Sequence, residues 1–172
     1  MVPTVRDRKH TTTTAAPRTL QLVTFTGGVA EYGLDIASIT EVIRPLPVTP
    51  LPHMPVFIEG VINLRGVIIP VVDLRKRFGA RAEEDTARSR RMLIIRGAAR
   101  GLLGLAVDGV REVLLVPESS IAAAPEAATG AGADFIAGVA KVADRLVVLI
   151  DISRILSVDE RASLTEAGDV PA

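Results

Sequence analysis

Few residues in this sequence have the type and spacing that catalysis or metal binding requires. Cysteine is absent, which excludes disulfides, thiolate metal sites and a cysteine nucleophile, and the two histidines, His10 and His53, cannot build a His-rich metal site alone. His53 lies among prolines, which favours a surface or interface position over catalysis. Asp73 and Asp151 each follow an apolar run, and such a carboxylate pair could share acid–base work. Because each precedes a short possible helix, we interpret both as helix N-caps.

Sequence motifs for nucleotide binding and nucleophilic catalysis are also missing. There is no Gly-Lys dipeptide for a phosphate-binding loop, no Gly-x-Ser-x-Gly turn and no His-Glu-x-x-His. Gly97, Gly101 and Gly104 have the wrong spacing for a dinucleotide fingerprint. The sequence therefore predicts no catalytic, cofactor-binding or metal-binding residue, and favours a binding protein over an enzyme.

Composition narrows the class of binding partner. Lys+Arg and Asp+Glu both number 20, and aromatic residues make up only 3% of the 172 residues. A nucleic-acid binder usually has a basic face or stacking rings, so this balance argues against one. No apolar run approaches the roughly 18 residues that a membrane-spanning helix needs, and residues 1–19 lack the apolar centre of a secretory signal. We expect a cytoplasmic protein without direct membrane insertion.

The elements that must position any binding residues are mostly short strands. From Thr19 onward, apolar runs of four to eight residues alternate with turn residues, as in barrels and sandwiches. Short helical stretches are expected at 35–44, 75–78 and 151–156, whereas the proline-rich segment 45–55 is neither helix nor central strand. The expected strands are 19–26, 31–34, 61–62, 67–74, 92–96, 102–107, 110–116, 139–142 and 146–150.

The two halves of the chain resemble each other. Phe-Ile-x-Gly-Val occurs at 57–61 and again at 135–139, and the same offset of 78 residues aligns Asp73 with Asp151. A second block aligns 33–43 with 104–114, and the difference in offset falls in long connections. The pattern predicts a duplicated β unit whose halves pack together and leave a groove, a common place for a binding site. We place the boundary in the charged run 75–87, interpreted as a solvated linker.

The turn at residues 63–66, Asn-Leu-Arg-Gly, carries an unexplained arginine. A hairpin turn needs glycine or asparagine, and it does not need Arg65 beside an apolar leucine at its tip. Arg65 is either a solvated side chain or an interface anchor, since arginine is enriched among residues that dominate binding energy.

Read together, these segments resemble the CheW family of chemotaxis coupling proteins. The resemblance is strongest at 57–74 (FIEGVINLRGVIIPVVDL) and continues in 32–36 (YGLDI), 39–42 (ITEV) and 104–110 (GLAVDGV). It covers roughly residues 19–157.

The resemblance implies an all-β fold of two tandem, five-stranded SH3-like barrels with short helical segments. We therefore expect a flexible tail at 1–18, a first barrel at about 19–80, a second at about 88–150, a short helix at about 151–157 and a C-terminal tail at 158–172. The Ala/Gly-rich loop 122–134 matches no motif of the family.

The resemblance also implies a non-enzymatic adaptor, without a cofactor, in chemotaxis signal transduction. Its expected partners are the regulatory domain of a CheA-type histidine kinase, the cytoplasmic tips of chemoreceptors (methyl-accepting chemotaxis proteins) and, as a further class, other CheW-like domains. Such a protein is cytoplasmic and is recruited to membrane-associated receptor arrays. The alternative is a small β-barrel that binds nucleic acid or a small ligand, against which the few aromatics and zero net charge argue.

Nine residues are candidates for partner binding by their position in the family's motifs. Of these, the polarity of Glu41 and Arg65 is unexplained by folding, whereas Gly60 and Gly104 are interpreted as backbone requirements. The first-barrel candidates are Ile39, Glu41, Gly60, Asn63 and Arg65, and the candidates near the receptor groove are Met92, Leu93, Gly104 and Val113.

Overall fold

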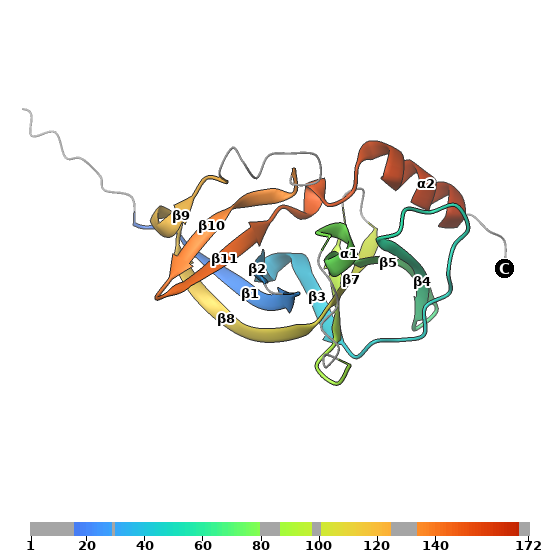
Figure 1. Cartoon of the computed structure of the whole chain (residues 1–172), viewed down its shortest axis with the longest axis horizontal. Helices are drawn as coiled ribbons and strands as arrows, with labels where there is room; N and C mark the ends of the chain where they lie inside the picture. The colour runs from blue at the N-terminus through green and yellow to red at the C-terminus, as the bar shows by residue number, and fades with distance from the viewer. Residues whose placement is uncertain (1–15, 29, 80–86, 98–100, 125–133, 169–172) are drawn as a thin grey trace, which may run out of the picture.

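The expected strands form two sheets in the computed structural model, which describes residues 16–28, 30–79, 87–97, 101–124 and 134–168 (Figure 1). This confirms the mostly-β prediction. The expected tail before residue 16, residues 80–86 of the charged run and most of the 122–134 loop lie outside the described residues. The strands are β1 (Thr19–Gly27), β2 (Ala30–Asp35), β3 (Ile39–Ile43), β4 (Ile58–Leu64), β5 (Val67–Asp73), β6 (Arg91–Arg96), β7 (Leu102–Val107), β8 (Gly109–Pro117), β9 (Ile121–Ala122), β10 (Ile136–Val142) and β11 (Arg145–Ile150).

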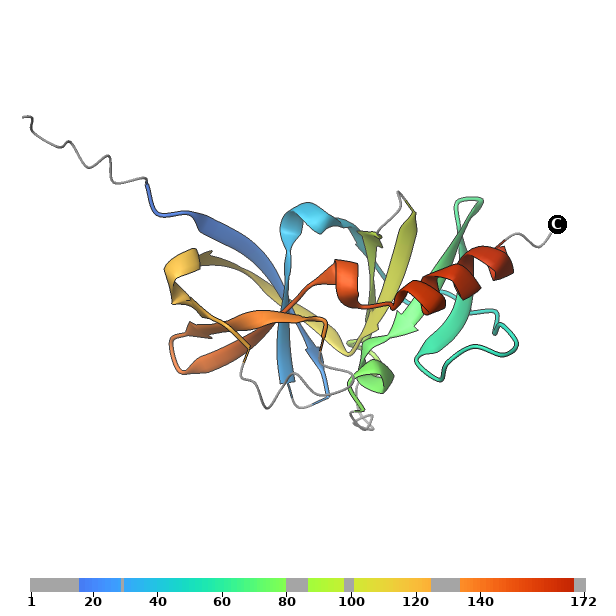
Figure 2. The ribbon, with the colours of Figure 1, turned by 90° about the horizontal axis from the view of Figure 1, so that it is seen from above.

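Each sheet curls into a small barrel, and the two barrels lie side by side (Figures 1 and 2). The six-stranded barrel has the order β8-β1-β2-β11-β10-β9, and the five-stranded barrel has the order β3-β6-β7-β5-β4. The strand beyond the expected five is β9, which has only two residues. In the five-stranded barrel, Thr49 of the proline-rich segment pairs with Val61 of β4.

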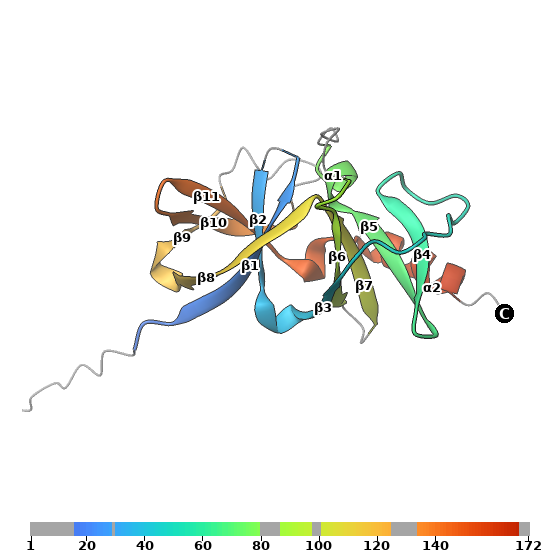
Figure 3. The same ribbon diagram turned by 90° about the horizontal axis from the view of Figure 1, so that it is seen from below.

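The strands are not divided between the barrels as the sequence suggested. We expected barrels at 19–80 and 88–150, but β1 and β2 belong with β8–β11, while β6 and β7 belong with β3–β5. In Figure 3, β8 and β1 run together on one side while β3 crosses to the other barrel. The physical reason is two parallel pairings, β5 with β7 and β11 with β2. Through them the first hairpin of each repeat, β1–β2 or β6–β7, joins the barrel formed by the rest of the other repeat.

The register supports the internal repeat. Val71 pairs with Gly104 in one barrel, and the aligned residues Leu149 and Gly33 pair in the other. The bridge between Thr49 and Val61 likewise recurs as the pairing of Ala122 with Val139. Both barrels are therefore built on one pattern, with bulges at aligned places in β4 and β10.

One apolar cluster joins the two barrels, and a smaller cluster fills each of them. The shared cluster contains Phe25 and Leu34 from the six-stranded barrel and Val72 and Leu105 from the five-stranded barrel. Four aromatic rings cross the same region in the order Phe25, Tyr32, Phe78, Phe135, with centroids 5.9, 4.4 and 4.6 Å apart; the first two pairs are stacked and the third is tilted. Because this core is continuous, the barrels are packed as one body.

The short helical segments partly match the sequence prediction. The expected helix at 35–44 is wrong: only one 3₁₀ turn, η1 (Ile36–Ser38), forms before β3 begins. The β-branched residues of 39–43 alternate in exposure there, as strand packing requires. Asp73 and Asp151 are N-caps as predicted, for α1 (Leu74–Arg77) and for the 3₁₀ turn η5 (Ile152–Arg154).

The C-terminal region is not the expected tail, because residues 158–168 form the helix α2 (Val158–Gly168). Ser157 and Glu160 form a capping box: the Glu160 carboxylate accepts from Ser157 N at 2.7 Å, and Ser157 Oγ accepts from Glu160 N at 3.2 Å. Leu164 joins the shared core, so α2 lies against the five-stranded barrel (Figures 1 and 2). Within the described residues, no helix is long and apolar enough to span a membrane.

Candidate partner-binding site

The tip of the β4–β5 hairpin places Arg65 in an unusual backbone conformation. Leu64 pairs with Val67, so Arg65 and Gly66 form a two-residue turn, with φ values of 51° and 86°. Asn63 supports the turn, because its Oδ1 accepts from Gly66 N at 2.8 Å. Two-residue turns with positive φ at both positions favour asparagine and glycine. The turn geometry therefore does not select an arginine at position 65.

Arg65 and Glu41 form a bidentate ion pair. Arg65 Nη1 donates to Glu41 Oε1 at 2.8 Å, and Nη2 donates to Oε2 at 2.9 Å. These hydrogen bonds lower the pKa of Glu41 and raise that of Arg65. Since β3 and β4 are the two edges of the sheet, the pair bridges the seam of the five-stranded barrel. The polarity of both residues is thus partly explained by folding, contrary to our interpretation of the sequence.

Arg65 nevertheless remains available to a partner, since its side chain is 71% exposed. Sequence reasoning missed three exposed apolar side chains on the strands that carry or follow this pair: Val42 on β3, next to Glu41, and Val67 and Ile68 on β5, directly after the turn. For Val67 and Ile68 the sequence held a signal, because neighbouring residues of a strand point to opposite faces and cannot both face one core. An exposed arginine at a turn, with exposed aliphatic side chains on the same strands, is suited to protein recognition.

The two candidate glycines hold backbone positions. Gly60 has φ +139°, and a Cβ there would lie 2.0 Å from the carbonyl oxygen of Thr49. At Gly104 a Cβ would lie 3.4 Å from Val71 and 3.6 Å from Met92. Gly60 therefore permits the close approach of Thr49, in agreement with the backbone role that we assigned to it, whereas a Cβ at Gly104 would make only ordinary van der Waals contacts.

The remaining candidates do not form one surface. Met92 and Leu93 are buried in β6, at 2% and 0% exposure, so they pack in the core and do not present a surface to a partner. Ile39 is half-buried against the shared core. Val113 is 53% exposed on β8, beside the exposed Leu115, and so belongs to the other barrel. The candidates thus fall into three groups. Glu41, Asn63 and Arg65 lie at the seam of the five-stranded barrel and form what we call the seam site; Val113 lies on an exposed face of β8; and the other candidates are buried or half-buried.

A counterpart of the Arg65–Glu41 pair lies on the six-stranded barrel. Arg145, near the tip of the β10–β11 hairpin, donates to Glu112 at 2.7 Å and lies 3.4 Å from Glu31. The hydrogen bond that Arg145 donates to Glu112 raises the pKa of Arg145. Glu112 aligns with Glu41 in the repeat, and Ala143, which aligns with Arg65, has the same positive φ of 52°. The alignment predicted the glutamate, whereas the arginine has shifted by two positions.

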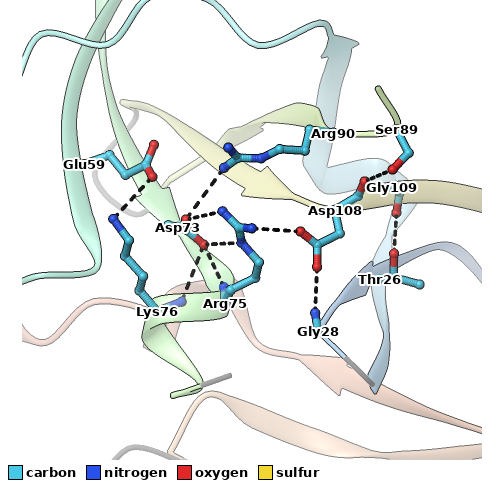
Figure 4. A network of polar contacts seen from close by, with 10 residues as sticks. All are labelled: Thr26, Gly28, Glu59, Asp73, Arg75, Lys76, Ser89, Arg90, Asp108 and Gly109. Atoms are coloured by element: carbon cyan, nitrogen blue, oxygen red, sulfur yellow. Dashed lines mark hydrogen bonds and ion pairs between the residues drawn. The ribbon is translucent and has the colours of Figure 1, made fainter. Parts of the chain in front are cut away.

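A buried network of charges lies where the barrels meet (Figure 4). Arg75 donates to Asp73 through Nε at 3.2 Å and Nη2 at 2.9 Å, and its Nη1 lies 3.2 Å from Asp108 Oδ1. Asp108 Oδ2 in turn accepts from Gly28 N, in the turn between β1 and β2. Burial alone raises the pKa of Asp73, but the bonds and charge of Arg75 outweigh it, so the pKa lies below its ordinary value. The network ties α1 of one barrel to a turn of the other.

Comparisons with known proteins agree with this architecture. The family model of the CheW-like domain matches residues 21–160. The chain is 36% identical over 145 residues to the chemotaxis protein CheW of Klebsiella aerogenes, covering 83% of this chain and 84% of that protein. It is 33% identical to the CheW of Rhizobium meliloti, covering 82% and 90%.

A solved structure is also similar. It is that of the scaffolding protein TtCheW from Thermoanaerobacter tengcongensis, with a TM-score of 0.74 and 36% identity. The match covers 84% of this chain and 96% of that one. On the family model, the relatives and the fold together, the chain belongs to the CheW family.

Proposed function

We propose that this chain is a non-enzymatic scaffold of chemotaxis signalling, which couples chemoreceptors to a CheA-type histidine kinase in the cytoplasm. Membership of the family carries the proposal, since relatives of similar length are named chemotaxis proteins and one is described as a scaffold. The exposed Arg65 on a turn that does not require it adds a local reason to expect protein binding. Recruitment to receptor arrays at the membrane belongs to the same proposal.

The proposed kinase-binding face is the seam site, formed by Glu41, Asn63 and Arg65, together with the exposed Val42 on β3 and Val67 and Ile68 on β5. The β8 face with Val113 and Leu115 is the proposed second contact. Separate faces on the two barrels suit a connector, because each barrel can then hold a different domain. Contacts of this kind are individually modest and gain strength through multivalency.

Reconstitution tests the proposal directly. Kinase and receptor fragments are mixed with and without this protein, and kinase phosphorylation and co-sedimentation are measured. We expect the protein to enter the complex and to increase receptor-dependent phosphorylation. If it neither assembles with the fragments nor changes the rate, the scaffold function is wrong.

Exchanging the charges of Glu41 and Arg65 distinguishes two roles of Arg65: binding a partner and closing the barrel through the ion pair. Arg65→Glu should weaken capture of the kinase's regulatory domain, with Arg96→Glu as an exposed control on another strand. The double variant Glu41→Arg/Arg65→Glu restores the ion pair in reverse. If Arg65 contacts the partner, the swapped protein remains defective while its thermal midpoint returns to that of the wild type. If the swapped protein captures the regulatory domain normally, Arg65 acts only by closing the barrel through its ion pair and does not contact the partner.

The alternative, a barrel that binds nucleic acid, is not favoured by the placement of the aromatic rings. Phe25, Tyr32, Phe78 and Phe135 pack against one another as buried or half-buried rings, and Phe57 lies under the guanidinium of Arg77, whose Cζ is 4.5 Å from the ring centroid. These are all the aromatic residues of the chain. Base stacking needs exposed rings, so this surface has none to offer.

A further inference from the structure

A basin lined by arginines lies where β3 ends and β6 begins. It has a volume of about 550 Å³, and we call it the arginine basin. It adjoins a second hollow of about 140 Å³, which shares Pro45, Arg90 and Arg91 in its lining and which we call the apolar pocket. The basin is lined by Arg44, Pro45, Ala87, Arg88, Arg90 and Arg91. The rest of the apolar pocket is Leu46, Val48, Met92, Ala106 and one carboxylate, Glu59.

Strand pairing brings these arginines together from distant parts of the sequence. Ile43 pairs with Met92 in the antiparallel β3–β6 ladder, so Arg44 follows one strand at the place where Arg91 opens the other. Arg91 is held in position, because its Nη1 donates to the carbonyl oxygens of Arg88 at 3.1 Å and Arg90 at 2.7 Å. The basin is thus built on the rigid sheet and on a turn fastened to it.

Among the described residues, the lining of the basin contains four arginines and no carboxylate. In the described part of the chain, Arg90 is the only one of the four arginines with a carboxylate within 4.0 Å, namely Asp73 at 3.7 Å. Glu59 is already paired with Lys76, at 3.5 Å. Arg44, Arg88 and Arg91 therefore lie close together without a described counter-charge. Such a field attracts anions, and guanidinium groups bind carboxylates with bidentate geometry.

We propose that the arginine basin and the apolar pocket together bind an acidic peptide segment of another protein. Its carboxylates would lie on Arg44 and Arg88, and one apolar side chain would enter the pocket beside Met92. The pocket is close to the cavity of about 150 Å³ that accommodates a benzene molecule in an engineered protein, so it suits one side chain. A small inorganic anion would leave this pocket empty. The proposal does not rest on the scaffold function, since neither Arg65 nor Glu41 takes part.

A labelled seven-residue peptide, with leucine flanked on both sides by aspartates and glutamates, is the probe, and its binding to the full chain is measured by fluorescence anisotropy. Two further probes are the same peptide with glycine replacing leucine, and inorganic pyrophosphate as a competitor. The variant is Arg44→Glu/Arg88→Glu. The matched control is Arg96→Glu/Arg111→Glu, which makes the same charge change at two exposed arginines outside the basin.

We expect saturable, salt-sensitive binding that weakens about tenfold in the basin variant and changes little in the control. The glycine peptide should also bind about tenfold more weakly, because it buries no apolar side chain. If both variants lose the same affinity for the leucine peptide, the loss comes from the net charge of the protein and not from the basin, and the proposal is overturned. Absence of saturable binding, equal affinity for the glycine peptide, or basin-dependent binding of pyrophosphate alone would also overturn it. Should the double variant not fold, Arg88→Glu is compared with Arg111→Glu.

Discussion

Replacing Gly60 by alanine is the sharpest test of how the five-stranded barrel closes. The new Cβ would lie 2.0 Å from Thr49 O, 2.7 Å from Thr49 C and 2.9 Å from the Cα of Pro50. A carbon and a carbonyl oxygen approach no closer than about 3.3 Å, so Thr49 must move away by more than about 1 Å. Since all three atoms belong to the backbone, no side chain can rotate to relieve the clash.

The cost of this substitution can be estimated from two contributions. Moving Thr49 breaks the bonds Thr49 N to Val61 O, at 2.8 Å, and Val61 N to Thr49 O, at 2.9 Å, each worth about 1 kcal/mol. Holding alanine at φ +139°, a region occupied almost only by glycine, costs about 1–3 kcal/mol more. The free energy of unfolding should therefore fall by about 3–5 kcal/mol, or about 6–20 °C in thermal midpoint.

Gly66→Ala is the matched control in the same hairpin. Gly66 also has a positive φ, +86°, but a Cβ there would meet nothing within 4 Å. Its expected cost is the backbone contribution alone, about 1–2 kcal/mol. Both variants are compared by urea unfolding monitored by circular dichroism. If Gly60→Ala loses no more stability than Gly66→Ala, the close approach of Thr49 does not matter and the reasoning is refuted.

The remaining predictions concern the charge network and α2. Arg75→Met leaves the buried carboxylates of Asp73 and Asp108 without their main cation, and should cost about 3–5 kcal/mol at pH 7. Part of this loss should return at low pH, where the Asp73 carboxylate left without Arg75 becomes protonated; a pH-independent loss in urea titrations would contradict the role of charge. In the wild type, the lowered pKa of Asp73 stabilises the fold above the carboxyl's ordinary pKa of about 3.9, and this contribution is lost as the pH falls through the folded value. Asp73→Asn should accordingly show a shallower loss of stability with acid, measured by unfolding at pH 2–5, and an unchanged slope would show that another group titrates. Ser157→Ala removes one bond of the capping box and should lower the unfolding free energy by about 0.5–2 kcal/mol, whereas Ser163→Ala, later in α2, serves as the comparison.

Local features of the fold were largely readable from the sequence. Alternating apolar runs predicted nearly all strands, and the aspartates at 73 and 151 were correctly interpreted as caps. The helix α2 was missed because a single core leucine, Leu164, gives it little apolar periodicity, although Ser157 and Glu160 have the spacing of a capping box. The expected helix at 35–44 ignored the β-branched residues at 39–43, whose strand pairing with β6 decides the structure.

Long-range relations were the part that the sequence could not supply. The repeat aligned the two halves correctly. It does not show whether the first hairpin of each repeat packs in its own repeat's barrel or in the other one, because the same residues are buried in either case. The ion pair of Arg65 with Glu41 depends on the two sheet edges meeting, so neither residue revealed its partner. The same limit concealed the arginine basin, whose members come from residue 44 and from residues 88–91.

The exchange of hairpins between the barrels has a consequence for how the chain can be divided. A cut between Gly79 and Ala87 would separate the two repeats, yet each fragment would hold three or more strands of one barrel and the first hairpin of the other. Neither fragment contains a complete sheet, so each needs its complement to cover its apolar face. The contact pattern is that of a dimer that has swapped hairpins and whose subunits have been joined end to end. Two copies of one such repeat that exchange their first hairpins would form both barrels without a covalent link, and aligned surfaces of the two barrels would then be equivalent.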